Sequence, residues 1–594
     1  MSPDDVSEGP APIALEPVVP DAVLERLPLR GRERPRAIAW FGFSAFWGHL
    51  RHLLASAIAT DNVDSRQWMV PEEPAVLLER AIARLRRRGA SPAPTLTEAM
   101  GGEVWVDFVS DTGDDATVSE RVAELLSSTY TVPDGEGTLV LPRGDVLLLG
   151  GDLAYPVATV REVTRRLVTP WNRVLERLPD GPPRVLLAVP GNHDWYDGLD
   201  GFARLCQAPL PFEENLGAEA LHPKPSAFPV LAWAEAFAKG EAVEKPKAMA
   251  LHGYFPVQRT SYFRLPLADG LDLFGVDRQL KAVDERQSAF FAREPKPRAR
   301  LVVVPDPARA WGERRQHGVD TLASLGIRPE AEPTLVLAGD IHHYERSTDG
   351  PSLHVVAGGG GAFLHGARVA GREAYPVDAE FPGKRASRKL LWQLPHTLAL
   401  GGSGWLVLVL FALMSASPLV EAARGEARAA LPLAVGIGAV YAVAAGMLVG
   451  MRKHRPHRVI PLSILNGAAL VAVPLVLGQA LHRWLSGAAW LAGLVGAFVL
   501  ATVACGYLFG VFLAVLAAAG VNHEQSWAAL GVPGFKHFVR LRIRSASRAP
   551  DGSPSASGTR LDAWVIGQVD PVRRSPIVLI DQFSFFPPGE NPVA

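Results

Sequence analysis

Short apolar runs that end in glycine-rich polar loops recur along the chain. The runs at 146–149 and 185–189 contain only aliphatic residues, and each is followed closely by glycine and then by Asp, Asn or His. A continuous apolar run before a turn is typical of a strand buried on both faces. Carboxyl ends of neighbouring parallel strands meet at one edge of a sheet, so these two loops are predicted to place their polar side chains together.

The same pattern predicts further strands and, with them, an α/β sandwich. An alternating stretch at 103–109 ends in SDTGDD, and the run at 334–338 ends in GDIHHYER. Repetition of strand, polar loop and helix indicates an α/β fold. The other elements predicted here are strands at 271–276 and 301–304 and helices at 73–88 and 118–129.

Later in the chain the pattern changes to long apolar segments, which predict transmembrane helices. They lie at 398–420, 430–451, 460–481 and 484–520. Each has at least the roughly 20 apolar residues that a helix needs to cross the hydrocarbon core. Basic residues precede the first segment and separate the second from the third, so the region before the first segment and the C-terminus are predicted to be cytoplasmic. The segments are almost free of charge, which argues against a transporter of polar substrates.

The two ends of the chain are predicted to differ from its centre. Residues 1–35 are rich in Pro, Asp and Glu and predict a poorly ordered lead-in without a cleaved signal. The segment 37–59 has the length of a span, but it contains Arg51 between two histidines. A charge in mid-bilayer is costly, so this segment is interpreted as a helix on the soluble domain or at the membrane surface.

Three strand-like runs at the C-terminus predict a small β-rich module over residues 521–594. Its basic residues would contact anionic lipid or, more simply, form a solvated strand face. These residues are Lys536, Arg540, Arg542 and Arg544.

Composition narrows the possible functions. The chain has 594 residues and a net charge of −1, which argues against a nucleic-acid-binding surface. Its two cysteines are far apart in the sequence, so neither a disulfide framework nor a thiolate metal site is expected.

The polar loops form a recognisable ordered set. In chain order they read SDTGD, GGDLAY, GNHD and AGDIHHYER. Over about residues 103–370 this set resembles the calcineurin-like metallophosphoesterases, and in motif pattern the purple acid phosphatases most closely. The resemblance implies a β-sandwich flanked by helices (α/β/β/α) with a dinuclear metal site at the strand ends.

The resemblance also assigns roles to single positions. Asp111 and His342 match ligands of the first metal ion, Asp152 matches the carboxylate that bridges both ions, and Asn192 matches an amide ligand of the second. His193 takes the place of the histidine that contacts the phosphate and protonates the leaving group. The simpler interpretation makes these residues loop caps or core polar groups.

Three positions depart from the commonest family pattern. Gly113 stands where many members of the family have a metal-binding histidine. The subgroup without this histidine uses a tyrosinate instead, and Tyr155 matches its position. The alternative is that Tyr155 is simply packed in the core. Asp340 replaces the first histidine of the family motif G-H-x-H. The strand at 301–304 should be followed by a metal-binding histidine, and Asp306 is the nearest residue that could replace it. If both ligate, the second ion has an all-oxygen shell, which favours Mn²⁺, Mg²⁺ or Ca²⁺ over Zn²⁺. The first shell suits iron or manganese.

Neighbouring polar residues are interpreted as structural. Asp114, Asp115, Asp194 and Asp197 are predicted turn formers. His354 and His365 flank the glycine-rich loop, where either could approach a substrate, and a structural role is the simpler interpretation of both. Tyr344, Glu345 and Arg346 are expected to support the His342 loop.

The sequence therefore predicts a membrane-anchored metal-dependent phosphoesterase that hydrolyses a phosphate mono- or diester through metal-activated water. The alternative is an eroded membrane scaffold or sensor that binds a phosphorylated ligand or a single ion without turnover. The predicted partners are the phosphate ester and the membrane; substrate identity and oligomeric state stay open. The domains are predicted at 1–35 (lead-in), 36–100 (helical), 101–390 (metallophosphoesterase), 398–520 (about four transmembrane helices) and 521–594 (β-rich).

Overall fold

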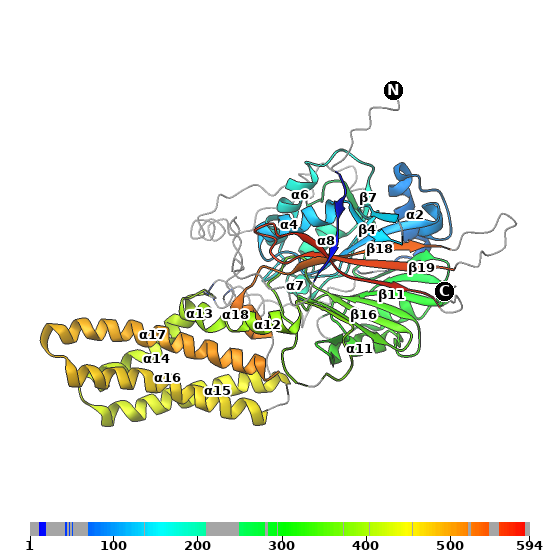
Figure 1. Cartoon of the computed structure of the whole chain (residues 1–594). Helices are drawn as coiled ribbons and strands as arrows, with labels where there is room; N and C mark the ends of the chain where they lie inside the picture. Colours follow the sequence, from blue (N-terminus) through cyan, green and yellow to red (C-terminus); the bar gives the residue numbers. More distant parts are fainter. Residues whose placement is uncertain are drawn as a thin grey trace, which may run out of the picture.

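Two facing β-sheets and a bundle of long helices make up the described structure (Figure 1). The computed structural model describes residues 11–18, 42, 43, 47, 50, 69, 71–135, 137–209, 249–279, 283–293, 295–371, 373–402, 404–453, 456–520, 524–545 and 558–587. The lead-in is thus described only at 11–18, where two short strands form. The helix predicted at 37–59 lies outside the described residues, apart from a few isolated positions.

The first sheet has eight strands and carries three of the predicted site loops. β3, β6 and β7 are parallel neighbours, so their carboxyl ends lie at the same edge. In sheet order the strands are β2 (Glu16–Pro17), β20 (Ile577–Phe585), β19 (Arg560–Gln568), β18 (Lys536–Arg544), β3 (Glu103–Val109), β6 (Val146–Leu149), β7 (Arg184–Ala188) and β8 (Tyr254–Pro256).

The second sheet has seven strands, and its central four run parallel. In sheet order they are β17 (Ala379–Phe381), β15 (Tyr344–Asp349), β16 (Ser352–Ala357), β14 (Thr334–Ala338), β11 (Ala299–Val304), β10 (Leu271–Gly275) and β9 (Phe263–Ala268). Outside both sheets lie the short strands β1 (Ile13–Ala14), β4 (Tyr130–Asp134), β5 (Gly137–Leu141), β12 (Arg309–Ala310) and β13 (Glu313–Arg314).

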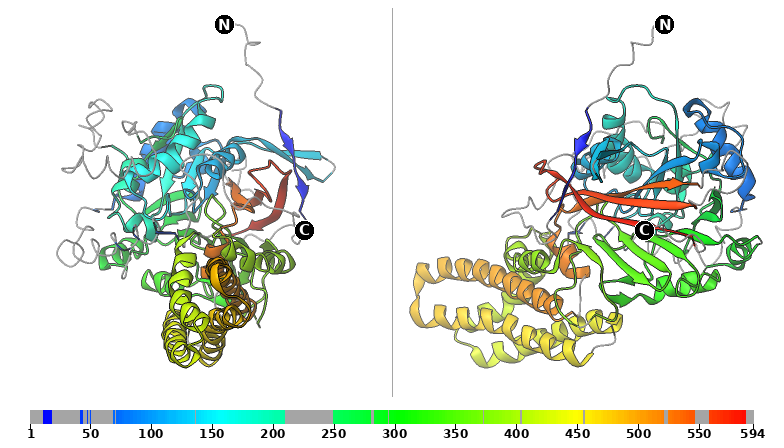
Figure 2. Two further views of the ribbon diagram at one scale, coloured as in Figure 1. Left: turned by 90° about the vertical axis from the view of Figure 1, so that its left-hand side faces the viewer. Right: turned by 45° about the vertical axis from the view of Figure 1, so that its right-hand side comes forward.

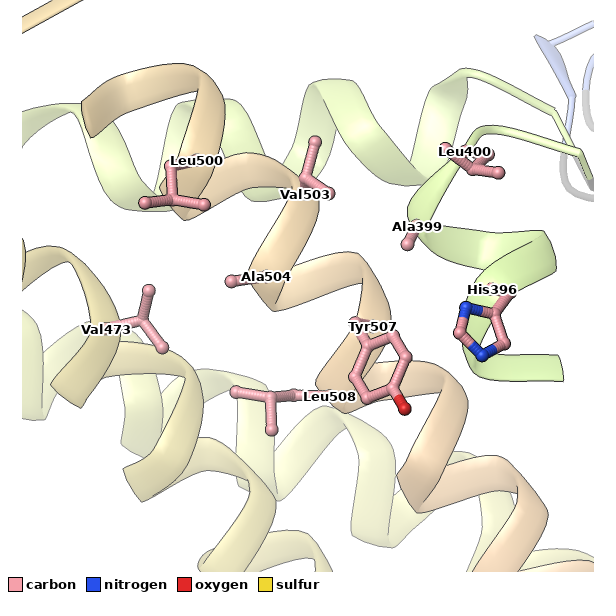
Figure 3. Close-up of a pocket in the computed structure, with 9 residues that line it drawn as sticks. All are labelled: His396, Ala399, Leu400, Val473, Leu500, Val503, Ala504, Tyr507 and Leu508. Atoms are coloured by element: carbon pink, nitrogen blue, oxygen red, sulfur yellow. The ribbon is translucent and has the colours of Figure 1, made fainter. Parts of the chain in front are cut away.

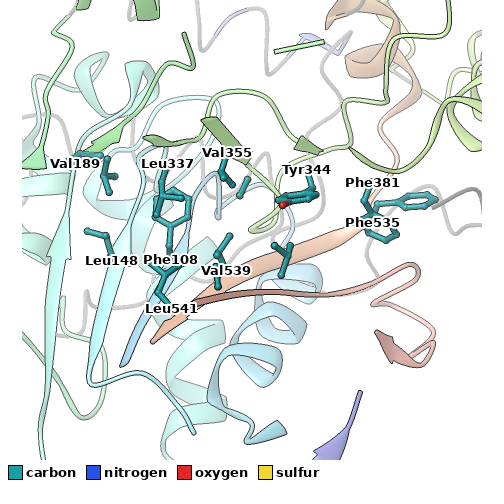
Figure 4. Close-up of a cluster of buried hydrophobic side chains, with 14 of the residues drawn as sticks. Phe108, Leu148, Val189, Leu337, Tyr344, Val355, Phe381, Phe535, Val539 and Leu541 are labelled. Carbon is teal, nitrogen blue, oxygen red and sulfur yellow. The ribbon is translucent and has the colours of Figure 1, made fainter. Parts of the chain in front are cut away.

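The strands alternate between an inner and an outer apolar layer. In β3, Val106 and Phe108 belong to the cluster between the sheets, whereas Trp105 and Val109 belong to the outer cluster. The inner cluster also holds Leu337 of β14, and Figure 4 shows it beside Phe108. Alternation with period two buries both faces of a strand. The two sheets together with the helices confirm the predicted mixed α/β class.

Helices cover the sandwich on its outer faces and at one end. The outer cluster includes apolar residues of α4, α6, α8, α10 and α11, and the inner cluster is capped by residues of α2 and α3. The helices are α2 (Pro74–Leu85), η1 (Arg86–Arg88), α3 (Leu96–Ala99), α4 (Ala116–Ser127), α5 (Val160–Val163), η2 (Thr164–Val168), α6 (Thr169–Leu175), α7 (Asn192–Trp195), α8 (Asp200–Cys206), α10 (Glu285–Phe291), α11 (Gln316–Ser324), α12 (Lys384–Leu391), α13 (Leu394–Ala399) and α18 (Glu524–Leu530).

The long apolar helices project together from the sandwich in every view (Figures 1 and 2). They are α14 (Leu406–Ala423), α15 (Ala427–Lys453), α16 (Pro456–Trp484) and α17 (Gly487–Ala518). Among the described residues, three stretches are long and apolar enough to cross a membrane: Leu406–Ala423, Val459–Trp484 and Gly487–Ala518. Leu413 and Leu465 are exposed on the bundle surface by 69% and 68%, as expected of side chains that face lipid.

Four spans were predicted, and the fourth is not confirmed, because α15 contributes a shorter described apolar stretch, Arg428–Ala444. The first helix also starts later than predicted, since α13 ends at Ala399 and α14 begins at Leu406.

An apolar pocket of ≈ 510 Å³ lies between α13, α16 and α17 (Figure 3). Its lining is aliphatic apart from His396 and Tyr507, whose ring centroids are 5.3 Å apart. The pocket therefore belongs to the bundle and contains none of the predicted site residues.

The C-terminal region was predicted as a small β-rich module, and its strands join the first sheet. β18 pairs antiparallel with β3, and β19 and β20 extend the same sheet. Lys536 and Arg540 are fully buried, so they form neither a solvated face nor a lipid-binding surface. The sandwich is therefore completed by residues that follow the membrane helices in sequence.

Candidate functional site

Three of the predicted ligands occupy the same kind of backbone position. Asp111, Asp152 and Asp340 follow β3, β6 and β14 and have φ angles of 62°, 52° and 64°. Residues other than glycine rarely adopt this left-handed region, and such strained positions cluster at functional sites. Each aspartate thus turns the chain sharply at the end of its strand.

The side chains of three predicted ligands converge on the phenol oxygen of the fourth, Tyr155. This oxygen lies 2.8 Å from Oδ1 of Asp111, 3.3 Å from Oδ2 of Asp152 and 3.2 Å from Nε2 of His342. Nε2 of His342 is itself 3.3 Å from Oδ1 of Asp111. Residues from both sheets therefore meet at one point.

These spacings fit the ligands of one metal ion. Oxygen and nitrogen ligands bind such ions at about 2.1 Å, which places adjacent ligands of an octahedral shell about 3 Å apart. Nδ1 of His342 lies 2.7 Å from the carbonyl oxygen of Phe363, to which it donates its proton. That bond leaves Nε2 as the lone-pair nitrogen, the usual arrangement of a metal-binding histidine.

The charges of the cluster also favour a cation. Burial raises the pKa of Asp152 well above its usual value, and so do the nearby carboxylates Asp111, Asp194 and Asp340. Burial likewise raises the pKa of Tyr155, with Asp111 and Asp152 adding to the shift. A bound cation reverses such shifts, because it stabilises the ionised forms.

Tyr155 is essential to this arrangement. Among His, Cys, Asp and Glu alone, no group of three or more in the described part of the chain is placed to hold a metal ion. The candidate site thus depends on the tyrosine oxygen that joins Asp111, Asp152 and His342.

Two glycines have no side chain where the carboxylates of Asp152 and Asp111 lie. A Cβ atom on Gly191 would lie 2.1 Å from Oδ1 of Asp152, and one on Gly339 would lie 2.7 Å from Oδ2 of Asp111. Neither separation is sterically possible, so any other residue at these positions would displace a predicted ligand.

His193 lies beside this cluster, at the start of α7. Its backbone N–H donates to Oδ1 of Asp152 at 2.9 Å, and its ring centroid is 4.5 Å from that of Tyr155. Nδ1 donates to the carbonyl oxygen of Pro156 at 2.6 Å, which makes Nε2 the nitrogen that can exchange a proton. Nδ2 of the neighbouring Asn192 donates to Tyr196 at 3.1 Å.

Asp194 organises the two central loops. Its Oδ2 accepts backbone N–H groups of Asp152 and Gly191, both at 2.8 Å, and its Oδ1 accepts that of Leu153 at 3.1 Å. The interpretation of Asp194 as a turn former is confirmed, as is that of Asp115, which caps α4. His365 is also structural, since its Nδ1 accepts the backbone N–H of His342 at 3.0 Å.

The remaining predicted ligands have other contacts. The backbone N–H of Asp340 donates to Oδ2 of Asp111 at 3.1 Å. The carboxylate of Asp306 forms an ion pair with Arg278, a residue that the sequence analysis did not single out. The sequence could have indicated Arg278, because this residue directly follows Asp277 at the end of a predicted strand.

Comparison with known proteins gives partial likenesses only. No protein-family model and no curated protein matches the chain. A solved structure described as "GAP50 the anchor in the inner membrane complex of Plasmodium" aligns over 47% of this chain and 78% of its own, with 11% identity and a TM-score of 0.26. PhoD aligns over 46% of this chain, with 10% identity and a TM-score of 0.23, and this chain covers 59% of PhoD. Both TM-scores are below 0.5, so neither likeness bears on the chemistry of the site.

Proposed function

We propose that this protein is a membrane-anchored, metal-dependent phosphoesterase. The observation that carries the proposal is the convergence of Asp111, Asp152 and His342 on the phenol oxygen of Tyr155, within 2.8 to 3.3 Å. Two carboxylates, a phenol and an imidazole suit an iron or manganese ion. For a second ion the resemblance leaves Asn192, Asp306 and Asp340.

The residues of the chain would divide the work of hydrolysis. A bound ion lowers the pKa of a coordinated water and stabilises the negative charge that develops on a phosphate. Asp152 and Tyr155 provide the anionic oxygens that hold such an ion. His193 is proposed as the general acid, because its bond to Pro156 orients the ring and leaves Nε2 to deliver a proton to the leaving oxygen.

We propose four membrane spans, with the sandwich in the cytoplasm. β18 follows the bundle in sequence and pairs with β3, which precedes it, so both strands lie on the same side of the membrane. The number of crossings between them must then be even. Three helices have the length and composition of a span, and α15 is proposed as the fourth.

The first test is hydrolysis of p-nitrophenyl phosphate and its bis-ester by the full-length protein in detergent, with Mn²⁺, Fe²⁺, Mg²⁺ or Zn²⁺ added. We expect metal-dependent turnover that falls at least about tenfold in Asp152→Asn and in Tyr155→Phe, because each loses an oxygen that holds the ion. Tyr254→Phe is the matched control, since this tyrosine lies on β8, outside the site, where its hydroxyl accepts a hydrogen bond from Arg143.

Turnover that needs no metal, or that survives both substitutions, would contradict the proposal. A protein that binds the ion and turns over neither substrate would instead be the scaffold or sensor.

A further inference from the structure

A protein cation lies where the resemblance expects ligands of a second metal ion. Arg278 contacts the carboxylate of Asp306 through Nη1. The side chains of Arg278 and Asp306 are only 19% and 8% exposed, so the pair is largely withdrawn from water. In this arrangement Asp306 is already neutralised by a guanidinium and is not available as a metal ligand.

The backbone around Arg278 is fixed on both sides. Gln287 accepts the N–H of Asp277 at 3.0 Å through Oε1 and donates to its carbonyl oxygen at 2.7 Å through Nε2. Oδ1 of Asp277 accepts the N–H of Gln279 at 2.8 Å and Nε1 of Trp195 at 2.9 Å. Trp195 is in α7, the helix that also carries His193. The loop therefore holds Arg278 in a defined place relative to the proposed general acid.

The charges around Arg278 are those that a second ion would use. Burial lowers the pKa of Arg278, but attraction to Asp306, Asp340 and Asp152 outweighs it and raises the pKa above its usual value. A divalent ion bound among the same carboxylates would be repelled by the guanidinium. The residues available for a second ion, which lie beside the positive charge of Arg278, are therefore poorly suited to hold a cation. The residues around Tyr155 are well suited to hold one.

We infer that the centre holds a single metal ion and that the guanidinium of Arg278 serves in place of the second, binding the phosphate oxygens of the substrate. A guanidinium presents a planar fork of N–H donors that matches a phosphate, and it stays charged at any physiological pH. The inference rests on the proposed function, since it assigns the phosphate-binding residue of that same site.

The number of metal ions per chain distinguishes failure of this inference from failure of the proposed phosphoesterase function. The full-length protein is loaded with Mn²⁺ in detergent, freed of unbound ion, and its manganese is counted per chain by mass spectrometry. One ion per chain supports the inference. Two ions would overturn it and leave the phosphoesterase proposal standing, whereas a folded protein with no ion, loaded with Mn²⁺ or Fe²⁺, would contradict both.

Binding of inorganic phosphate to the manganese-loaded protein, measured by calorimetry, tests the role of Arg278 without turnover. We expect Arg278→Gln to keep its ion and to bind phosphate about tenfold more weakly or worse, with partial recovery in Arg278→Lys. Arg298→Gln is the matched control, because Arg298 forms a similar pair with Asp269 at an exposed site.

Asp306→Asn gives an independent check. We expect this variant to keep its ion, because its carboxylate holds Arg278 and not the metal. Loss of the ion in Asp306→Asn, or unchanged phosphate binding in Arg278→Gln, would refute the inference.

Discussion

The buried residue His537 supports the glycine-rich loop that follows β16, although it is not one of the predicted ligands. The backbone N–H of His537 donates to the carbonyl oxygen of Gly359, at 3.1 Å, and its Nδ1 donates to Phe535 at 3.2 Å. The histidine is fully buried, which lowers its pKa to about 3, and the neighbouring charge of Lys536 adds to this. The glycine-rich loop after β16 is thus supported by a histidine that must stay neutral.

This residue makes the fold sensitive to acid. The folded pKa of about 3 lies below the unfolded value, so stability is present at neutral pH and is lost as the pH falls below about 6.5. Between pH 7 and 5 the loss through His537 is expected to be about 2 kcal/mol. Thermal unfolding at both pH values should therefore show a smaller drop in Tm for His537→Gln than for the wild type. Equal drops would show that His537 is not the responsible group.

Sequence reasoning reaches some residues of the site and misses others for physical reasons. Asp111, Asp152 and His342 follow apolar strands, so the periodicity alone places each of them at the carboxyl end of a strand. Arg278 could not be found in this way, because a guanidinium is not a metal ligand and a basic residue at a strand end does not indicate a metal site. The bond between His342 and the carbonyl oxygen of Phe363 leaves no signal in the sequence, since any residue supplies a carbonyl.

At the scale of elements, one buried ion pair joins the C-terminal strands to the rest of the sheet. The guanidinium of Arg540 donates to both oxygens of Asp107, at 2.7 and 3.0 Å. It also donates to the carbonyl oxygens of Leu126, Ser128 and Leu141, at 2.8, 2.9 and 3.0 Å. Every N–H of the group is therefore used inside the protein, which explains how a charge is tolerated there.

Removing one partner of this pair should be costly. Arg540→Met leaves the Asp107 carboxylate buried without its cation, and we expect a loss of about 3–5 kcal/mol in the free energy of unfolding. Arg544→Met, whose half-exposed side chain pairs with Asp562, should cost less than about 1 kcal/mol. Thermal unfolding in detergent compares the two, and similar Tm values for both variants would contradict the assigned role of Arg540.

The strands themselves are predictable, and their pairing is not. The apolar runs at the C-terminus identify β18, β19 and β20, but the same runs would suit a module of their own. Pairing of β18 with β3 depends on contacts between residues as far apart as Arg540 and Asp107, 433 positions in sequence. Local periodicity holds no information about such partners.

At the scale of the whole molecule, the sheet constrains the path through the membrane. Residues before and after the bundle share one sheet, so the loops after α14 and after α16 must lie on the opposite side from the sandwich if all four helices cross. Glu426 and Ser486 are exposed in these two loops, whereas Asp180 is exposed on the sandwich.

Labelling of single introduced cysteines checks this path, and the two native cysteines are buried. In intact cells an impermeant maleimide should react with Glu426→Cys and Ser486→Cys but reach Asp180→Cys only after permeabilisation. The reverse pattern would place the sandwich outside the cytoplasm. Reaction of only one of the two loop variants would mean that only two of the four helices cross.

The strands of the first sheet are separated in sequence by the helix bundle, and this separation sets the order in which they are synthesised. The ribosome releases β3, β6 and β7 first, then the whole bundle, and only afterwards the strand that covers the free edge of β3. Until that moment the growing chain carries an unpaired, apolar strand edge, the kind of surface that aggregates. Closure of the sandwich, and with it the support of the glycine-rich loop, is therefore delayed until the whole bundle has been synthesised.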